Sequence, residues 1–143
     1  MLFLPALGTV VERRHRFSQA DFDLFARLSG DDNPIHVDPA FAAQMRFGKP
    51  VAHGMLLYGI ICGLLSRHFP DAVQLEQRML YPAPTFAGEE ICVRAQLIAA
   101  SPELGHATFS TVITGEDGRV TCEGQTLLQF PFAGLQRKER LDR

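Results

Sequence analysis

Two residues that together can move protons lie five positions apart in the first third of the chain. Asp31 and His36 flank an Asn33-Pro34 pair, and Gly30 ends the apolar periodicity that precedes them. Proline fixes its own φ and pushes the residue before it into extended conformations. We therefore expect one defined shape in which the carboxylate and the imidazole converge. Polar side chains in such a stiff loop indicate chemistry rather than packing.

Helices are predicted on both sides of this loop. Ser18 and Asp21 form a capping-box-like start for a helix over residues 19–28. Asp38 and Pro39 are typical of a second helix start, as N-cap and first helical residue. Capping thus explains Asp38, whereas Asp31 and His36 have no such structural role and remain the candidates for chemistry.

The stretch 55–65 is apolar on every side, with no charge before Arg67. A helix of this kind is buried on every face, so other elements must surround it. Five segments have strand-like composition and are separated by turn signals: 9–17, 75–81, 90–99, 105–114 and 118–130. We predict an α+β fold in which a mostly antiparallel sheet of about five strands wraps around a central buried helix. One domain would span 1–135, followed by a charged tail, 136–143.

Composition excludes several classes of protein. The formal charge of −2 gives no global attraction to nucleic acid or to an anionic membrane. The longest apolar run, 54–65, is shorter than the roughly 20 residues that span a bilayer, and the first eight residues lack signal-peptide features. Cys62, Cys92 and Cys122 are odd in number, which is typical of reduced thiols in a cytoplasmic protein. No residues have metal-ligand spacing, so neither a metal nor another cofactor is expected.

Two blocks of sequence carry a family resemblance, and a third supports it more weakly. Residues 26–39, ARLSGDDNPIHVDP, and residues 47–56, FGKPVAHGML, resemble the signature of the MaoC-like (R)-specific enoyl-CoA hydratases and acyl dehydratases. Residues 81–89, YPAPTFAGE, stand where the family usually has an apolar-Pro-Val-apolar-Gly-Asp run. Glu89 replaces the usual Asp and Thr85 the usual Val, which leaves the shape of the acyl pocket open.

The resemblance implies the hotdog fold and reversible hydration of trans-2-enoyl-CoA to (R)-3-hydroxyacyl-CoA. It makes Asp31 and His36 the catalytic pair and assigns the Gly54 backbone N–H to the thioester oxygen. The pair would hold one water, but which member is acid and which base stays open, because coupled groups share their titration. Gly54 suits its task because it opens the apolar helix, where its N–H lacks a helical partner and lies at the positive dipole end.

Other residues near these blocks have weaker assignments. Five are expected to bind the substrate: Ser29, Arg46, Lys49, His53 and Met55. Arg46 and Lys49 lie between the pair and the glycine and are candidates for the phosphates of coenzyme A or a carrier protein. His53 is better explained by a hydrogen bond that fixes the turn over 52–54. Asn33 either orients the loop or the water, or only forms the turn before Pro34.

Alternative functions remain within and beyond this family. A 3-hydroxyacyl-[acyl-carrier-protein] dehydratase of fatty acid synthesis would use the same fold and pair. A non-catalytic acyl-thioester-binding subunit belongs to a different class, and the intact pair of Asp31 and His36 argues against it. The resemblance also implies a homodimer or higher homo-oligomer in which two sheets join edge to edge. The expected ligand is a coenzyme A or carrier-protein thioester, not nucleic acid or membrane.

Overall fold

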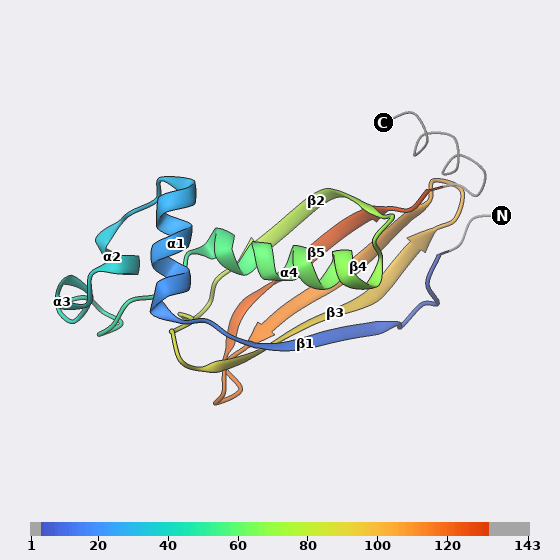
Figure 1. The fold of residues 1–143 in the computed structure, drawn as a ribbon. Helices are drawn as coiled ribbons and strands as arrows, with labels where there is room; N and C mark the ends of the chain where they lie inside the picture. Colours follow the sequence, from blue (N-terminus) through green and yellow to red (C-terminus); the bar gives the residue numbers. More distant parts are fainter. Residues whose placement is uncertain (1–3, 132–143) are drawn as a thin grey trace.

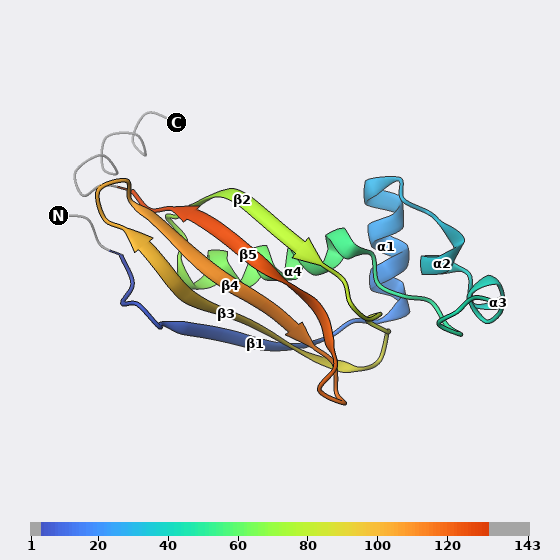
Figure 2. The same cartoon turned by 180° about the vertical axis from the view of Figure 1, so that it is seen from behind.

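The computed structural model describes residues 4–131 of the chain. Its elements, in order, are β1 (Val10–Arg16), α1 (Gln19–Ser29), α2 (Pro34–Val37), α3 (Pro39–Ala42), α4 (Gly54–His68), β2 (Val73–Leu80), β3 (Glu90–Ser101), β4 (His106–Thr114) and β5 (Val120–Gln129). The strands form one antiparallel sheet in the order β1-β3-β4-β5-β2. Helix α4 lies along one face of this sheet, and α1 to α3 gather at one end of it (Figures 1 and 2). The predicted domain end at 135 and the predicted tail lie outside the described residues.

Helix α1 begins and ends as its sequence predicts. The Asp21 N–H donates to Ser18 Oγ at 3.2 Å, and the Ser18 N–H donates to the Asp21 carboxylate at 2.8 Å. This reciprocal capping box satisfies two amides that a helix start leaves unpaired. At the other end Gly30 takes φ 78°, a left-handed conformation that a glycine adopts without strain. The helix stops there, and the chain turns directly into Asp31.

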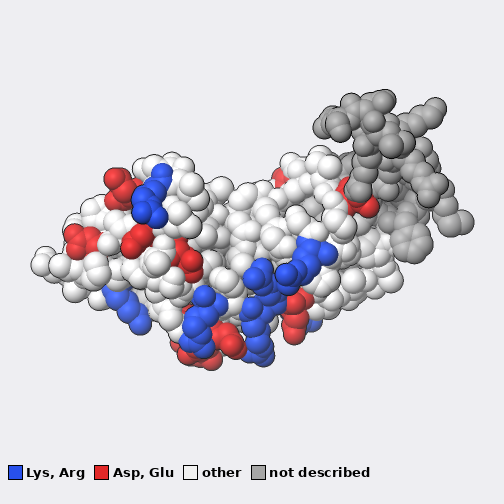
Figure 3. All heavy atoms as spheres, in the orientation of Figure 1, with Lys and Arg blue, Asp and Glu red and all other residues white. Residues whose placement is uncertain are grey.

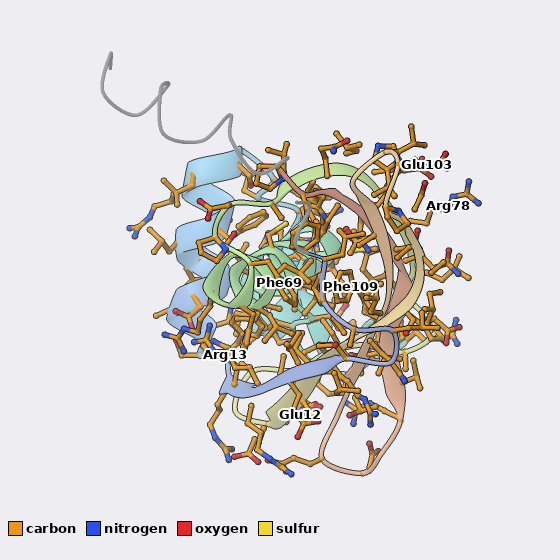
Figure 4. All side chains as sticks on the ribbon, turned by 90° about the vertical axis from the view of Figure 1, so that its right-hand side faces the viewer. Glu12, Arg13, Phe69, Arg78, Glu103 and Phe109 are labelled. Carbon is orange, nitrogen blue, oxygen red and sulfur yellow. The ribbon has the colours of Figure 1, made fainter. Side chains whose placement is uncertain are left out.

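The core lies between α4 and the sheet. Along β4 the residues alternate, so that Ala107, Phe109 and Ile113 are fully buried while the intervening side chains face the other side. Four α4 side chains are buried against this layer: Leu57, Ile61, Leu64 and Leu65. Each contributes about 1.5–3 kcal/mol relative to an exposed side chain. In the end-on view of Figure 4, Phe69 and Phe109 lie in the middle of the layer, with ring centroids 5.2 Å apart.

The α+β arrangement of one long apolar helix on an antiparallel sheet is confirmed, but the helix is not covered on every face. Met55 is 56% exposed, and Gly59 and Gly63 are also exposed on the side of α4 that faces away from the sheet. A Cβ atom added to either glycine would meet nothing within 4 Å. The sheet covers only one side of α4, so the opposite side is left open among the described residues.

Candidate active site

Asp31 and His36 come from two different elements. Asp31 directly follows the end of α1, whereas His36 lies on α2, a single helical turn where the sequence predicted a rigid loop. The turn forms because Pro34 occupies its first position and Asn33 caps it, accepting a hydrogen bond from the Ile35 N–H at 3.2 Å. The capping bond occupies the Asn33 side-chain oxygen, which matches its turn-forming alternative.

The His36 ring is fixed by a backbone carbonyl. Its Nδ1 lies 2.8 Å from the carbonyl oxygen of Val51. A carbonyl can only accept, so Nδ1 carries the proton and the Nε2 of the neutral ring keeps a free lone pair. This Nε2 lies 3.9 Å from the Asp31 Oδ2, too far for a direct hydrogen bond but suited to a shared water. The geometry thus offers a base and a carboxylate around one small volume.

Access to the two groups differs. The His36 side chain is 14% exposed and the Asp31 side chain 55% exposed. Ser29 shapes the turn from α1 into Asp31: its Oγ donates to the Phe25 carbonyl at 2.7 Å and accepts from the Asp31 N–H at 3.1 Å. Both bonds of the Ser29 hydroxyl are therefore made to the backbone, where they help to place Asp31.

His53 lies behind this pair. Its ring stacks on that of His36, with centroids 3.8 Å apart and planes inclined by 24°, and Phe25 contacts it with centroids 4.8 Å apart. Its Nε2 lies 2.9 Å from the Asp31 carbonyl oxygen, to which it donates. The residue is only 1% exposed, and burial lowers the pKa of its imidazole. The hydrogen bond predicted for His53 therefore joins α4 to the Asp31 backbone rather than closing the local turn.

Helix α4 presents its first amide next to these residues. Within residues 4–131 no hydrogen bond uses the Gly54 N–H, so this donor is available at the positive end of the helix dipole. The ring of Tyr81 covers Gly54: a Cβ at Gly54 would lie 2.7 Å from Tyr81 Cζ. A side chain at this position would push the ring away, which explains why glycine fits.

A cavity of about 570 Å³ opens beside this helix end. Its lining is mostly apolar: Arg46, Phe47, Val51, Ala52, Gly54, Leu57, Tyr81, Pro82, Ala83, Pro84 and Thr85. Arg46 is the only charged residue in this lining. Neither Asp31 nor His36 lines this cavity. Val51 joins the cavity to α2, because it is part of the lining, its carbonyl holds His36, and its N–H donates to the Ile35 carbonyl at 3.1 Å. A second hollow of about 640 Å³ lies on the outer face of β2, β4 and β5, away from the pair.

One wall of the cavity is anchored by an ion pair. Glu89, the replacement for the family's usual Asp, accepts from the Arg119 guanidinium, and the same carboxylate accepts from the Phe86 N–H at 3.3 Å. Lys49 lies over the Phe86 ring, with Nζ 4.4 Å from the centroid. Thr85 is 2% exposed, and its N-terminal neighbour Pro84 accepts from Arg119 at 3.1 Å. Glu89 and Thr85, the two departures from the family pattern, therefore lie in a wall of the cavity that Arg119 ties together.

Basic side chains on the face seen in Figure 3 run from the edge where β1 lies up toward α4. Two arginines of β1 are paired: Arg14 contacts Glu90 at 2.9 Å and Arg16 contacts Glu116 at 3.4 Å. Arg46 and Lys49, the predicted phosphate ligands, are both exposed at the α3 end of the molecule. Arg46 lines the same cavity as Gly54, whereas Lys49 lies over the Phe86 ring.

Other chemistries fit the described residues poorly. Asp31, His36 and His53 bring ligand atoms within 4.8 Å of one another. The two imidazole rings are stacked, however, and each uses one nitrogen on a carbonyl, so their lone pairs do not converge on one ion. Burial raises the pKa of the Cys62 thiol and raises that of Cys122 to about 11, so neither supplies a thiolate at neutral pH.

Comparison with known proteins identifies the family of this chain. A family profile described as a MaoC like domain matches residues 5–114. The chain belongs to the MaoC-like domain family. It is 36% identical over 127 residues to an (R)-specific enoyl-CoA hydratase of Aeromonas caviae, covering 87% of this chain and 95% of that protein. It is also 36% identical over 96 residues to a mitochondrial 3-hydroxyacyl-[acyl-carrier-protein] dehydratase of Arabidopsis thaliana, covering 67% of this chain and 58% of that protein.

Solved structures of MaoC-like proteins share the fold. The (R)-hydratase from A. caviae matches with a TM-score of 0.85 and 33% identity, over 89% of this chain and 98% of that one. An R-hydratase from Pseudomonas aeruginosa matches with a TM-score of 0.83 and 26% identity, over 89% and 83% of the two chains. The chain therefore has the hotdog fold that the resemblance implied. No helix within residues 4–131 has the length and apolar character needed to cross a membrane.

Two parts of the site were missed from the sequence. The Val51 carbonyl sets the tautomer of His36, and the Tyr81 ring covers Gly54. A backbone carbonyl leaves no mark on residue identity, so no sequence signal pointed to Val51. Tyr81 lies in the weakest of the three family blocks, where the pattern gave it no role.

Proposed function

We propose that this protein is a cytoplasmic enzyme that reversibly hydrates trans-2-enoyl-CoA to (R)-3-hydroxyacyl-CoA. The main support is the free Nε2 of His36, which lies 3.9 Å from the Asp31 carboxylate. The Gly54 N–H is unpaired among the described residues, and Gly54 lines an apolar cavity together with Val51, whose carbonyl holds His36. Relatives that cover most of the chain are named (R)-specific enoyl-CoA hydratases.

In this mechanism one water supplies both parts of the addition. The Nε2 of His36 accepts a proton from the water, and the hydroxide forms a bond to C3 of the enoyl group. Electrons move from the C2–C3 double bond onto the thioester oxygen, where the Gly54 N–H and the helix dipole stabilise the charge. The enolate collapses when C2 takes a proton from the pair, which restores the enzyme. Asp31 orients the water and stabilises the imidazolium that forms meanwhile.

The first experiment measures loss of enoyl absorbance with crotonyl-CoA, octenoyl-CoA and a crotonyl carrier protein, with product chirality. We expect hydration of the CoA substrates to the (R)-alcohol. His36→Ala and Asp31→Asn should each lower kcat by at least about 10²-fold, and the double variant should add little, because paired groups act as a unit. Near-normal turnover in either folded variant would contradict the assignment of the pair.

A second candidate is a dehydratase of acyl-carrier-protein thioesters, because the Arabidopsis relative bears that name. The chemistry at Asp31 and His36 would be the same, and only the carrier of the acyl group would differ. Faster turnover of crotonyl carrier protein than of crotonyl-CoA in the same assay would favour this candidate.

We also infer that the protein is a homodimer joined along β2 and the open face of α4. Strand β2 is an edge of the sheet, and its Val73, Leu75 and Leu80 are between 52% and 68% exposed. An open edge with large apolar side chains favours pairing with a second strand. Gly63, on the open face of α4, leaves room for a partner's approach.

The assembly is tested by light scattering after gel filtration. Gly63→Arg should convert the dimer to a folded monomer, because an added Cβ meets nothing within 4 Å in its own chain and the longer side chain would extend from the open face into the interface. Arginine is also a better helix former than glycine, so unfolding is not the expected cause. Ala20→Arg, on the exposed side of α1, is the matched control and should remain dimeric. A monomeric wild-type protein would refute the inference.

A further inference from the structure

One buried imidazole contacts both members of the catalytic pair without facing the cavity. His53 stacks on the His36 ring at a centroid distance of 3.8 Å and donates from Nε2 to the Asp31 carbonyl at 2.9 Å. The two contacts come from one side chain, which also immediately precedes Gly54. His53 therefore connects the acid, the base and the start of α4.

We propose that His53 is a positioning residue that sets the plane of the His36 ring and the place of Asp31 together. The proposal rests on the proposed hydratase function and adds a residue to it. His53 does not touch the substrate, since only 1% of its surface is exposed. It acts through the two residues that do.

The stack restrains the one motion that the His36 hydrogen bond leaves free. The bond from Nδ1 to the Val51 carbonyl fixes one ring atom, and rotation about it would swing Nε2 away from Asp31. His53 lies against one face of the ring at van der Waals distance, with Phe25 against His53 itself. Phe25 thus backs the His53 ring, and the stacked His53 ring limits the swing of Nε2.

The hydrogen bond restrains the partner. Asp31 follows Gly30 at the end of α1 and is the more exposed member of the pair, so its position depends on its backbone. The Asp31 N–H is held by Ser29 Oγ at 3.1 Å, and its carbonyl is held by His53 at 2.9 Å. With both backbone groups bonded, the main chain of Asp31 is fixed, which restricts its carboxylate to positions near Nε2, 3.9 Å away.

The protonation of His53 suits this role. Its titratable neighbours are His36 and Asp31, and burial is the main cause that lowers its pKa. A neutral His53 leaves the stacked His36 free to accept a proton during turnover, whereas a cationic ring would repel the imidazolium. The Nδ1 of His53 is buried and has no hydrogen-bond partner among residues 4–131, as expected for an imidazole kept neutral by its surroundings.

Two variants separate the two contacts. His53→Phe keeps a flat ring for the stack but cannot donate to Asp31, and His53→Gln keeps a donor but loses the ring. We expect each to lower kcat for crotonyl-CoA about 10- to 100-fold with KM changed much less, because small misplacements of reacting groups are costly. The pH at which kcat/KM is half-maximal should also move in both. His68→Gln, at an exposed position near the end of α4, is the control and should behave as wild type.

A measurement on the wild-type protein needs no variant to fold. Nitrogen-15 NMR of the histidine rings should show the proton of His36 on Nδ1 and that of His53 on Nε2, with His53 neutral at pH 6.5. A His53 ring protonated on Nδ1 would overturn the proposal. So would kcat and pH profiles within about two-fold of wild type in both His53 variants, if His36→Ala is inactive. Full activity of His36→Ala would instead refute the proposed function on which this inference rests.

Discussion

The helix-terminus role of Gly54 is tested by comparing two substitutions at this position, one of which removes the backbone N–H while the other keeps it. Gly54→Pro removes the donor, and Gly54→Ala keeps it. Proline is tolerated at the first position of a helix, and His53 before it already has the extended ψ of 138° that a residue before proline prefers. Both variants add a Cβ that would lie 2.7 Å from Tyr81 Cζ. Tyr81 is 46% exposed, so its ring can turn toward solvent in both.

The ratio of the two rates isolates the contribution of the amide. The Cβ that meets Tyr81 is common to both variants, so its steric effect cancels when Gly54→Pro is compared with Gly54→Ala. Loss of one preorganised donor to a developing oxyanion lowers kcat by about 10²–10³-fold, or about 2.7–4 kcal/mol. We therefore expect Gly54→Pro to be at least about 10²-fold slower than Gly54→Ala, with KM less affected, because the charge develops only in the transition state.

The assay follows enoyl absorbance at saturating crotonyl-CoA, with circular dichroism and gel filtration as controls for folding and assembly. Both variants should retain the wild-type spectrum. If Gly54→Pro turns over within about three-fold of Gly54→Ala, a difference below 1 kcal/mol, then the Gly54 N–H does not stabilise the thioester oxygen. The close approach of the Tyr81 ring would then be the only reason for a glycine at position 54.

Two further predictions concern stability. Gly124→Ala should lower the free energy of unfolding by about 1–3 kcal/mol in urea titrations. Its Cβ would lie 1.8 Å from the backbone oxygen of Arg78, and backbone cannot move aside as a side chain would. A loss below about 0.5 kcal/mol, as for an ordinary surface substitution, would refute this prediction. Burial lowers the pKa of His53 and of His15 below 6.5, so the unfolded chain binds more protons as the pH falls through about 6.5. The free energy of unfolding should therefore fall between pH 7.5 and pH 5, less steeply in His53→Gln, and a flat profile would contradict the lowered values.

Local sequence determined the parts of the fold that depend on neighbours along the chain. The capping box of Ser18 and Asp21 forms as predicted, and Asp38 caps α3 by accepting from the Phe41 N–H at 3.1 Å. Strand-like composition, the turn signals between the strands and the apolar stretch of α4 were enough to predict an antiparallel sheet with one long helix. These rules work because capping, turns and periodicity act over a few residues.

The sequence identified Asp31 and His36 as the residues of the site, but it did not determine how they are arranged in space. The bond from His53 to Asp31 joins residues 22 positions apart, and the one from His36 to Val51 spans 15. Such pairs are set by how α1, α2 and the start of α4 pack, and no local pattern specifies them. The tautomer of His36, and with it the place of the free lone pair, was therefore decided only in the tertiary structure.

The open face of α4 shows the same division. Its apolar sequence required burial on every side, because water disfavours exposed apolar surface wherever it lies along a helix. One sheet covers only one side of a helix, so Met55, Gly59 and Gly63 remain exposed within this chain. The sequence predicted an apolar helix packed against a sheet, and only the tertiary structure decided which side of the helix the sheet covers and which side stays open.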